Sequence, residues 1–535
     1  MASSVSDHDQ KYDRQLRLWG ADGQARLEKS HFCLLGAGPE GTETLKNLVL
    51  PGVGRFTIVD NAKVTERDLA NNFFVTEAEL GKNRAEVVAA WLHEINPDVK
   101  HVDPVVKCPS ELIEANPDFV TAYTFIVATD LPEKSLLKVA DACFRHKIPL
   151  AVVRIYGWMC YLRLQLPSYP VVESKPDNTI PDLRLAVPFP ELKAYADSFD
   201  LASLDDHKFS HVPFVVLLVK AVQNWRKAEG IADDVIPTPK VKEGILKALN
   251  DLKRRGIGGM NFPEASKFAM RTYVPYRVPD EVEALLNDER ALNLTKDTAD
   301  FWVAVAALRQ FRLAEGGGRY LPLIGTIPDM ETESATFVDI KNVYNTKFEQ
   351  DIAALQAHVH KLLASVGRDA ASITNDYLRH IVRNGFALRN FTFRTMAEEY
   401  AVETSAQELF QTTPLVDASS DLKFYFLLRA ADRFRTKNGH YPCSILAQEL
   451  EVELPEYEET VNKLAAEYSV PADFITPGHI LEFARWGASS MHNMGAVLGG
   501  VAAQEIIKAV TQQWEPLNNT WIFNGMDSTS AQLNL

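Results

Sequence analysis

The glycine-rich segment Gly36-Ala-Gly38-Pro-Glu-Gly41 constrains the fold of this chain more than any other feature. It follows the apolar run Phe32–Leu35 and precedes Thr42–Val49, which has the pattern of a helix. A strand, a glycine turn and a helix N-terminus together form a cradle for the phosphates of a dinucleotide or of ATP. Asp60 ends the next apolar run, where a carboxylate can bind a ribose hydroxyl. This motif alone fits dehydrogenases, flavoproteins and adenylating enzymes equally well.

Short apolar runs alternate with helical stretches through the first part of the chain. Such alternation is typical of a parallel sheet that is covered by helices on both faces. Residues 1–166 are therefore predicted to form the first part of a doubly wound, Rossmann-like α/β domain. The expected strands are Phe32–Leu35, Phe56–Asp60, Phe125–Ala128, Leu150–Val153 and Met159–Leu166.

Residues 167–480 have a different pattern, which is almost wholly helical. Proline-marked turns at Pro167–Pro170 and Pro188–Pro190 mark the change. The exception is Leu321–Asp329, an extended segment that contains Pro322 and Pro328. The expected helices are Val212–Lys227, Val241–Arg255, Pro279–Asn287, Thr298–Glu315, Phe348–Val366, Asn375–Asn384, Phe391–Glu399, Leu422–Asn438, Glu456–Tyr468 and His479–Trp486.

The α/β pattern returns in residues 481–535. Gly499–Lys508 predicts a helix with small residues on one face, which can lie close to a sheet. Trp521–Gly525 predicts a further strand. The chain is therefore expected to build one α/β domain from its two ends, with the helical block as a large insertion between them.

Composition excludes several classes of function. A formal net charge of −15 over 535 residues disfavours nucleic acid as the main partner. We find no apolar run near the roughly 18 residues that a membrane span needs. The five cysteines are Cys33, Cys108, Cys143, Cys160 and Cys443, with no CxxC pair. We therefore expect no metal site and no nucleophilic thiol, and a reducing, cytoplasmic location, with the nucleus left open.

The decapeptide Lys11–Gly20 lies just ahead of the glycine loop and contains Tyr12-Asp-Arg14-Gln. This Tyr-x-Arg-Gln run resembles the adenylation fold shared by ubiquitin-like activating enzymes and bacterial sulfur-carrier enzymes. In that family the arginine contacts the ATP γ-phosphate of the neighbouring subunit, as an arginine finger does. Arg14 is the matching residue. The alternative is an ordinary amphipathic helix, with Tyr12, Leu16 and Trp19 on the core and Arg14 and Arg17 in solvent.

Several charged groups of the resembled family are missing. Ala62 stands where the family has a second acid, and Asn71 lies in a run without the ATP-binding arginine. Arg84 occupies the position of the catalytic lysine, although a guanidinium cannot replace an ammonium group at a tight phosphate site. Asp130 matches the metal-binding aspartate, but Leu131 and Pro132 follow it. The resemblance thus implies a degenerate pocket.

We therefore expect no cofactor in this chain. Gly36, Gly38, Gly41 and Asp60 are interpreted as vestigial, and residual nucleotide binding is left open.

Further segments narrow the resemblance to the regulatory, adenylation-inactive subunits of activating enzymes for the NEDD/Rub modifier, the amyloid-precursor-binding type. They are Lys46–Gly52, Asn71–Phe74, Asp182–Leu185, Gly325–Met330, Lys341–Tyr344 and Leu498–Lys508. The resemblance implies a heterodimer in which the catalytic partner binds ATP and magnesium and transfers the modifier to its own cysteine. It also implies the modifier itself and the tail of an amyloid-precursor-type protein as partners.

The resemblance places a partner contact in the helical insertion, at Ile327, Pro328, Asp329 and Met330, at Lys341, Asn342 and Tyr344, and at His211. Tyr12 and Trp19 are predicted at the same interface. A segment held extended by prolines among helices suggests that it covers or meets something, either a partner or the domain's own core.

Two other classes of function remain open at this stage. One is an autonomous enzyme, either a homodimeric adenylyltransferase or an NAD(P)-dependent oxidoreductase. The missing ATP-binding groups weaken the first, and the Tyr-x-Arg-Gln helix has no use in the second. The other is a protein-binding scaffold in which Arg14 has no catalytic contribution.

Overall fold

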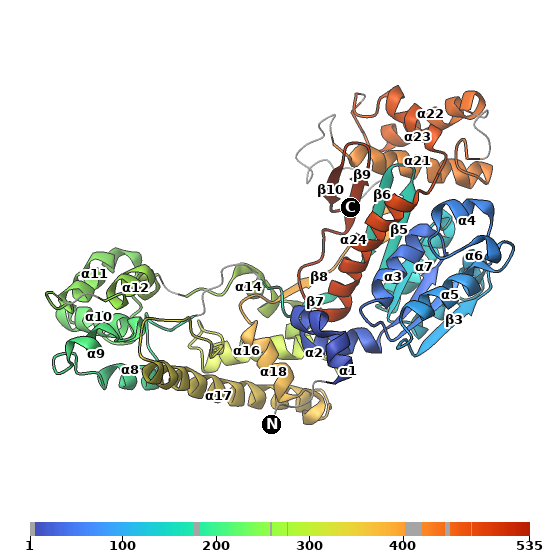
Figure 1. Ribbon diagram of the computed structural model, residues 1–535. Coiled ribbons are helices and arrows are strands. Elements are labelled where there is room, and N and C mark those ends of the chain that lie inside the picture. Colours follow the sequence, from blue (N-terminus) through green and yellow to red (C-terminus); the bar gives the residue numbers. More distant parts are fainter. Residues whose placement is uncertain are drawn as a thin grey trace. The chain divides into compact units, whose positions relative to one another are not determined.

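The computed structural model describes residues 6–175, 182–256, 259–274, 276–401, 420–444, 450–471 and 473–535. The chain divides into two compact units (Figure 1). The first unit comprises Met1–Val171 and Asn390–Leu535, and the second comprises Val172–Arg389. The first unit is thus built from both ends of the chain, with the second unit inserted between them.

The first unit is organised around an eight-stranded sheet with the order β10-β9-β6-β5-β4-β1-β2-β3. β1 pairs in parallel with β2 and β4, which extend the parallel part to β3 and β5. β6, β9 and β10 continue the sheet in antiparallel pairs. The strands are β1 (His31–Leu35), β2 (Arg55–Val59), β3 (His101–Val105), β4 (Phe125–Ala128), β5 (Leu150–Tyr156), β6 (Met159–Gln165), β9 (Thr520–Asn524) and β10 (Thr529–Leu533).

Both faces of the sheet are covered by helices. Phe32 and Leu34 point to a core formed with α3 and α24, whereas Cys33 and Leu35 point to a core formed with α7 and α21 to α23. This alternation confirms the doubly wound α/β class. The helices of this unit are α1 (Asp7–Lys11), α2 (Asp13–Lys29), α3 (Pro39–Val49), α4 (Glu66–Asn71), α5 (Arg84–Ile95), α6 (Pro109–Ala115), α7 (Glu133–Arg145), α19 (Met396–Tyr400), α21 (Leu422–Asn438), α22 (Leu450–Glu467), α23 (Pro477–Trp486) and α24 (His492–Thr511).

The sequence pattern missed the two edge strands, β3 and β10. β3 contains Asp103 and Pro104, and β10 begins with the polar residues Thr529 and Ser530. An edge strand is only partly covered, so it needs no continuous apolar run. Both segments therefore adopt a strand conformation because they pair with a neighbouring strand, and their own sequence pattern does not indicate it.

Helices α21 to α23 belong to the first unit, whereas the sequence pattern assigned residues 167–480 to the insertion. Tyr156 of β5 stacks on Phe483 of α23, with ring centroids 4.2 Å apart. Arg154 of the same strand forms hydrogen bonds of 2.7 and 2.8 Å with both carboxylate oxygens of Asp432 on α21. A run of helices in sequence does not reveal that these helices pack on the distant sheet.

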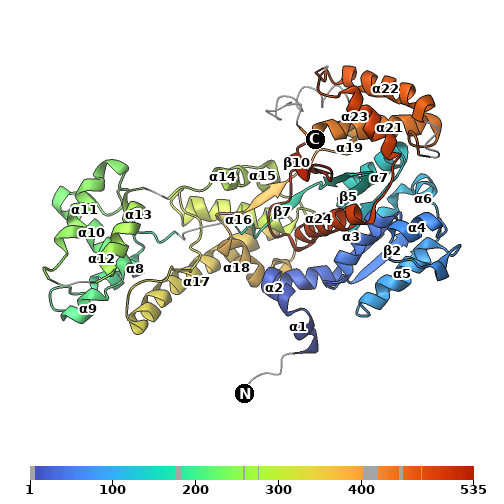
Figure 2. The same ribbon diagram turned by 45° about the horizontal axis from the view of Figure 1, so that its top comes forward.

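The long C-terminal helix α24 lies directly on α3 (Figures 1 and 2). A Cβ atom at Gly499 would lie 2.7 Å from the backbone of Glu43 on α3, so only glycine permits this approach. Gly495 also faces Pro39 of α3 and Ile155 of β5, but a Cβ atom there would lie at an ordinary contact distance of 3.5 Å or more. The predicted small-residue face therefore exists, and it lies mainly against a helix.

By length and composition, α24 is the one described helix that could cross a membrane. Of its most apolar window, 61% is buried against the rest of the first unit. This burial identifies α24 as a core helix.

The second unit is helical and has two hydrophobic cores, one around Phe214, Leu217 and Tyr344 and another around Trp302 and Leu355. Its helices are α8 (Pro190–Asp197), α9 (Asp206–Ser210), α10 (Phe214–Glu229), α11 (Lys242–Asp251), α12 (Asn261–Phe268), α13 (Met270–Tyr273), α14 (Asp280–Leu286), α15 (Glu289–Leu292), α16 (Asp300–Ala314), α17 (Ser334–Ser365) and α18 (Asn375–Arg383). Two short strands, β7 (Tyr169–Val171) and β8 (Arg389–Phe391), pair where the chain crosses between the units.

Several expected helices differ from the structure in their bounds. α22 already includes Leu450, ahead of the predicted start at Glu456, and α11 ends at Asp251, before the predicted end at Arg255. α17 begins at Ser334, well before the predicted start at Phe348, and it therefore includes Lys341–Tyr344. The predicted helix Phe391–Glu399 is wrong at its start, because Phe391 belongs to β8 and α19 begins only at Met396. Leu321–Asp329 has neither helix nor strand, as the sequence predicted.

We predict that Glu399→Gln strongly destabilises the first unit. The side chains of Arg163 and Glu399 are 0% and 1% exposed, and their atoms lie 2.7 Å apart. The variant would leave a buried guanidinium without its counter-charge, which costs about 3–5 kcal/mol. Urea unfolding followed by tryptophan fluorescence measures this loss.

Asp141→Asn is the matched control for that experiment, because Asp141 and Arg145 form an exposed pair on α7. Its effect should stay within about 1 kcal/mol. Equal unfolding midpoints for Glu399→Gln and the unmodified chain would contradict the prediction.

Candidate functional site

The glycine loop joins β1 to α3, as predicted from its sequence. Gly36 has φ of 96° and its N–H donates to the carbonyl of Val59. A Cβ atom at Gly41 would lie 2.8 Å from the carbonyl oxygen of Gly36, so glycine is required for the helix to begin this close to the strand. The backbone of a phosphate cradle is therefore preserved.

The cradle is occupied by a carboxylate of the chain itself. Glu40 lies in the first turn of α3, and its Oε1 would be 3.0 Å from a Cβ atom at Gly38. The side chain is buried, and burial raises the pKa of Glu40 to about 7. Its Oε2 has no hydrogen-bond partner among the described residues. When ionised, this carboxylate repels the phosphates that a helix N-terminus would otherwise attract.

Arg84 neutralises the predicted ribose-binding aspartate. Its Nη2 lies 2.7 Å from Oδ2 of Asp60, and its Nη1 lies 2.8 Å from Oδ1 of Asp68. Burial raises the pKa of Asp68, but hydrogen bonds from Thr65 and Arg84 outweigh burial and hold it below its usual value. Asp60 also accepts hydrogen bonds from the backbone N–H groups of Ala37 and Ala62. Both oxygens of the Asp60 carboxylate thus accept hydrogen bonds from groups of this chain.

Cationic and phenolic groups surround the predicted metal-binding aspartate. Arg435 donates to Oδ1 of Asp130 over 3.1 Å, and the hydroxyl of Tyr441 donates to the same oxygen over 2.5 Å. Arg154 lies 3.7 Å from that oxygen and is itself held by Asp432. Among the described residues, no group of three or more His, Cys, Asp or Glu side chains is arranged to hold a metal ion.

A polar pocket of about 430 Å³ lies beside the glycine loop, and its lining includes Glu40, Arg84 and Asp130. The fit to ATP and magnesium is poor at each predicted contact. A carboxyl group lies at the phosphate end, an arginine covers the ribose-binding acid, and two arginines and a tyrosine face the metal-binding acid. The residues present do not form a nucleotide-activating site.

Burial makes three of the five thiols poor nucleophiles. Cys33, Cys143 and Cys160 are buried. Burial raises the pKa of Cys160 to about 12 and those of Cys33 and Cys143 still further. A thiol with a raised pKa is a poor nucleophile at neutral pH. Cys108 and Cys443 are partly buried, and Cys443 lies two residues after Tyr441 of the pocket lining.

Arg14 lies on α2 and is exposed, and it forms no ion pair with another described residue. Arg17, one turn further along, is held by Asp13 at 3.0 Å. Gly20 interrupts the helix with a φ of 72°, which separates the segment that carries Arg14 from the rest of α2. Arg14 is thus presented to solvent on a short, fixed helical segment.

Tyr12 and Trp19, predicted at a partner interface, are 3% and 5% exposed. The hydroxyl of Tyr12 lies within hydrogen-bonding distance of Asn96 and Asp98, and the indole N–H of Trp19 donates to Gln24. Both rings fix the helix to its own unit, as the amphipathic-helix alternative predicted for them. The exposed residues of this helix include Arg14 and Leu18.

The predicted contact residues of the second unit divide into two groups. Asp329, Lys341 and Asn342 are exposed, and Pro328 is half-buried. Tyr344 is fully buried, and its hydroxyl donates to the carbonyl of Leu183. Tyr344 therefore lies in the core of its own unit, because its position on α17 faces inward.

Ile327 and Met330 pack against the same core as Tyr344 and remain half-buried. His211 is half-buried and stacks on His207, which lies 3.4 Å from Glu333 just ahead of α17. The predicted contact residues of the second unit thus lie on elements that pack on one core. The exposed polar residues on these elements are Asp329, Lys341 and Asn342.

Sequence reasoning missed Glu40, Arg154, Arg435 and Tyr441 as pocket residues. Glu40 was visible as an acid inside a phosphate-binding motif, and Arg154 was visible as a charge inside an apolar strand. Arg435 and Tyr441 carried no signal, because they reach the pocket only through the packing of distant helices.

Comparison with known proteins places the chain in a family. Residues 12–535 match the model of the ThiF family. The chain is 39% identical over 544 residues to the NEDD8-activating enzyme E1 regulatory subunit of Xenopus laevis, with 100% of both chains covered. It is 37% identical to the Danio rerio protein of that name, again over 100% of both chains. It is 36% identical to the regulatory subunit AXR1 of Arabidopsis thaliana, over 98% of this chain and 96% of that one.

The chain therefore belongs to the ThiF family, whose adenylation-type fold accounts for the first unit. Within that family it belongs with the regulatory subunits of NEDD8-activating enzyme E1. The resemblance inferred from the sequence is confirmed.

We predict that Glu40→Gln stabilises the chain above neutral pH. The native state holds the proton of Glu40 up to about pH 7, whereas an unfolded glutamate releases it near pH 4.5. Stability contributed by the protonated form is thus lost as pH rises from about 4.5 through 7. At pH 8 the free energy of unfolding of Glu40→Gln, measured with urea, should exceed that of the unmodified chain by about 2–3 kcal/mol. At pH 5 the difference between the two should be small.

Glu94→Gln, an exposed change on α5, serves as the control. It should show the same small effect at both pH values. A constant difference between Glu40→Gln and the unmodified chain from pH 5 to pH 8 would refute the buried titration.

Proposed function

We propose that this chain is the regulatory, adenylation-inactive subunit of a heterodimeric NEDD8-activating enzyme, which acts in protein neddylation. The observation that carries the proposal is that side chains of this chain pair with the acids of the pocket and fill its phosphate cradle. Arg84 holds Asp60 and Asp68, and Glu40 lies in the phosphate cradle. A chain that aligns with regulatory subunits throughout, yet has lost the charges that would bind ATP, fits a supporting role.

The chemistry in this proposal belongs to the catalytic partner. That subunit would bind ATP and magnesium, join the C-terminal carboxylate of the modifier to AMP and release pyrophosphate, and then transfer the acyl group to its own cysteine. Negative charge on the phosphates must be neutralised for this step. This chain would provide a docking surface and one cationic side chain.

Arg14 is the residue that we assign to the partner's ATP site. It is exposed and has no ion-pair partner among the described residues, so its guanidinium is free to meet an external phosphate. Tyr12 and Trp19 fix the backbone on both sides of it, which limits the entropy lost when the side chain binds.

The second proposed contact lies in the second unit, along Ile327–Met330 and the exposed side of α17 at Lys341 and Asn342. The segment is anchored by half-buried Ile327 and Met330, while Asp329 remains exposed. An anchored, extended segment can meet a partner with little loss of conformational freedom.

Experiments on the chain and on its complex would distinguish two alternative functions, a scaffold and an autonomous adenylyltransferase. A scaffold would support full activity of the complex without Arg14, and an autonomous adenylyltransferase would turn over ATP and modifier alone. Binding of an amyloid-precursor-type tail stays a prediction from the resemblance.

We predict that Arg14→Ala slows pyrophosphate exchange by the reconstituted heterodimer about 10- to 100-fold. An arginine finger can contribute about 10³-fold or more, but magnesium and the partner's own basic groups would share the phosphate charge here. Arg14→Lys should restore only part of the rate, because one ammonium group lacks the planar fork.

Arg17→Ala is the matched control, since Arg17 lies on the same helix and pairs with Asp13. It should change the rate much less. Size-exclusion chromatography establishes that each variant assembles. Normal assembly of Arg14→Ala with an unchanged exchange rate would remove Arg14 from the mechanism.

We predict that the catalytic partner slows hydrogen exchange over residues 327–344. Amides in the extended segment lack helix or strand hydrogen bonds, so a docked partner should protect them several-fold. Lys341→Ala should weaken the heterodimer, and Lys361→Ala, which changes an exposed lysine later on the same helix, should not. Unchanged exchange over 327–344 would show that the segment covers only its own core.

A further inference from the structure

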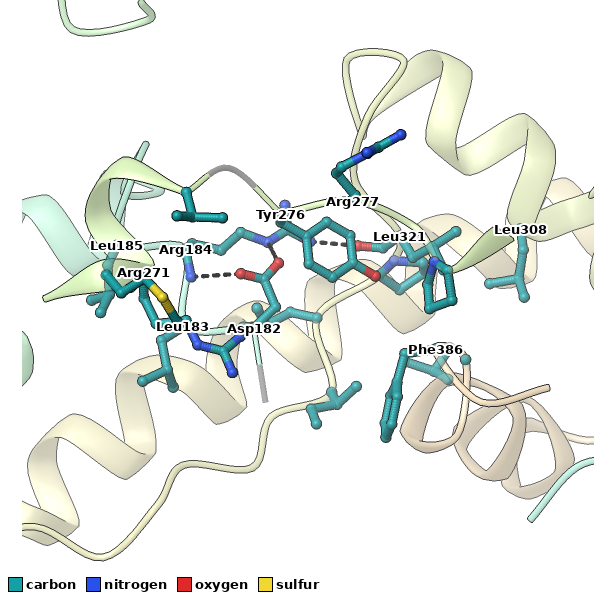
Figure 3. Close-up of a pocket in the computed structure, with 18 residues that line it drawn as sticks. Asp182, Leu183, Arg184, Leu185, Arg271, Tyr276, Arg277, Leu308, Leu321 and Phe386 are labelled. Atoms are coloured by element: carbon teal, nitrogen blue, oxygen red, sulfur yellow. Dashed lines mark hydrogen bonds and ion pairs between the residues drawn. The ribbon is translucent and has the colours of Figure 1, made fainter. Parts of the chain in front are cut away.

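The second unit contains a pocket of about 390 Å³ that plays no part in the proposed function. Its walls come from Asp182–Leu185, the chain around Met270–Pro279, the start of the extended segment at Leu321–Ile324, and α16 and α18 with the turn that follows α18. This volume lies in the range of pockets that bind small molecules. Figure 3 shows that the lining differs at its two ends.

At one end, Asp182, Arg184 and Arg271 lie near one another (Figure 3). Nε of Arg184 lies 2.6 Å from Oδ2 of Asp182. Arg184 also donates to the carbonyl of Leu321 and stacks over the ring of Tyr320, 3.9 Å from its centroid. Arg184 therefore neutralises Asp182, the only acid among the described residues of the lining, and the pair is held in place.

Two further arginines in the lining lack a counter-charge. Arg271 is half-buried and Arg277 is exposed, and neither forms an ion pair with another described residue. With Arg184 and Asp182 balanced, they leave the lining with two net positive charges. A half-buried guanidinium without a partner is unfavourable unless an anion or water meets it.

Tyr276 lies between the two ends of the pocket (Figure 3). Burial raises the pKa of Tyr276 far above neutrality, so its hydroxyl keeps its proton. That hydroxyl forms no hydrogen bond with another described residue, and it can donate to a ligand in the pocket.

The other end is apolar, with Leu308 and Phe386 on one side in Figure 3. Val382 also belongs to the lining. Met270 and Val274 also line the pocket, and they are 53% and 42% exposed. Large apolar side chains that stay exposed beside a cavity are typical of a binding site.

We propose that this pocket binds an amphipathic anion, a small molecule with an apolar body and a single carboxylate or phosphate group. The anionic group would meet Arg271 and the hydroxyl of Tyr276, because a guanidinium binds such oxygens through two parallel hydrogen bonds. The apolar body would lie against Leu308, Val382 and Phe386. This inference is independent of the partner subunit, since every lining residue belongs to the second unit of this chain.

Isothermal titration of the full chain with decanoate tests the proposal, with decyl phosphate, decanol and decylammonium as parallel ligands. We expect one saturable site for decanoate or decyl phosphate, and the tighter of the two identifies the anionic group. Decanol should bind at least about 10-fold more weakly, since a charged hydrogen bond is lost. Equal affinity for decanol or decylammonium would overturn the proposal, as would binding of neither anion.

Variants assign the site within the chain. Arg271→Gln should weaken anion binding about 10-fold or more, and Val274→Trp should block the cavity with an indole at a position that tolerates exposure. Arg309→Gln, a half-buried arginine on α16 outside the pocket lining, is the matched control. Thermal unfolding establishes that each variant is folded. Folded Arg271→Gln or Val274→Trp with unchanged decanoate affinity would overturn the proposal.

Discussion

Arg84 holds two carboxylates, Asp60 at 2.7 Å and Asp68 at 2.8 Å, and the properties of the pocket depend on this contact. Asp60 directly follows the second strand, where its oxygens also accept hydrogen bonds from the N–H groups of Ala37 in the glycine loop and of Ala62. The guanidinium therefore ties the loop, the strand end and α5 into one polar network. A buried network of this kind is stable only when every member is satisfied. A nucleotide ribose would have to displace a charged group that already has its partners.

Elsewhere in the pocket, groups expected to contact a ligand also contact other side chains of this chain. Glu40 lies in the phosphate cradle, while Arg435 and Tyr441 bind Asp130. The backbone of the adenylation fold is retained, because the sheet, α3 and α24 still need each other to bury their apolar faces. The chain has thus kept the packing of the adenylation fold, while ion pairs within the chain hold the charged groups of the pocket. That combination suits a subunit whose contribution is to a partner.

Sequence reasoning succeeded where a signal was local. The glycine loop, the central strands, the extended segment at Leu321–Asp329 and the helix Leu422–Asn438 all carry patterns that short-range physics dictates. It failed at β3 and β10, whose edge positions need no apolar run, and at the boundary at 480, because Arg154 and Tyr156 bind helices far along the chain. Tyr12, Trp19 and Tyr344 were placed at an interface, yet they fill the cores of their own units.

The sequence by itself determined the class of fold and the family, because glycine spacing, apolar runs and residue identity are local properties. Only the tertiary structure decided what the remaining charges do. Arg84, Arg435 and Glu40 are visible in the sequence, but a charge acts through the groups within a few ångströms of it, and those groups come from separate segments. The pocket around Arg271 likewise exists only because five separate segments meet in the second unit.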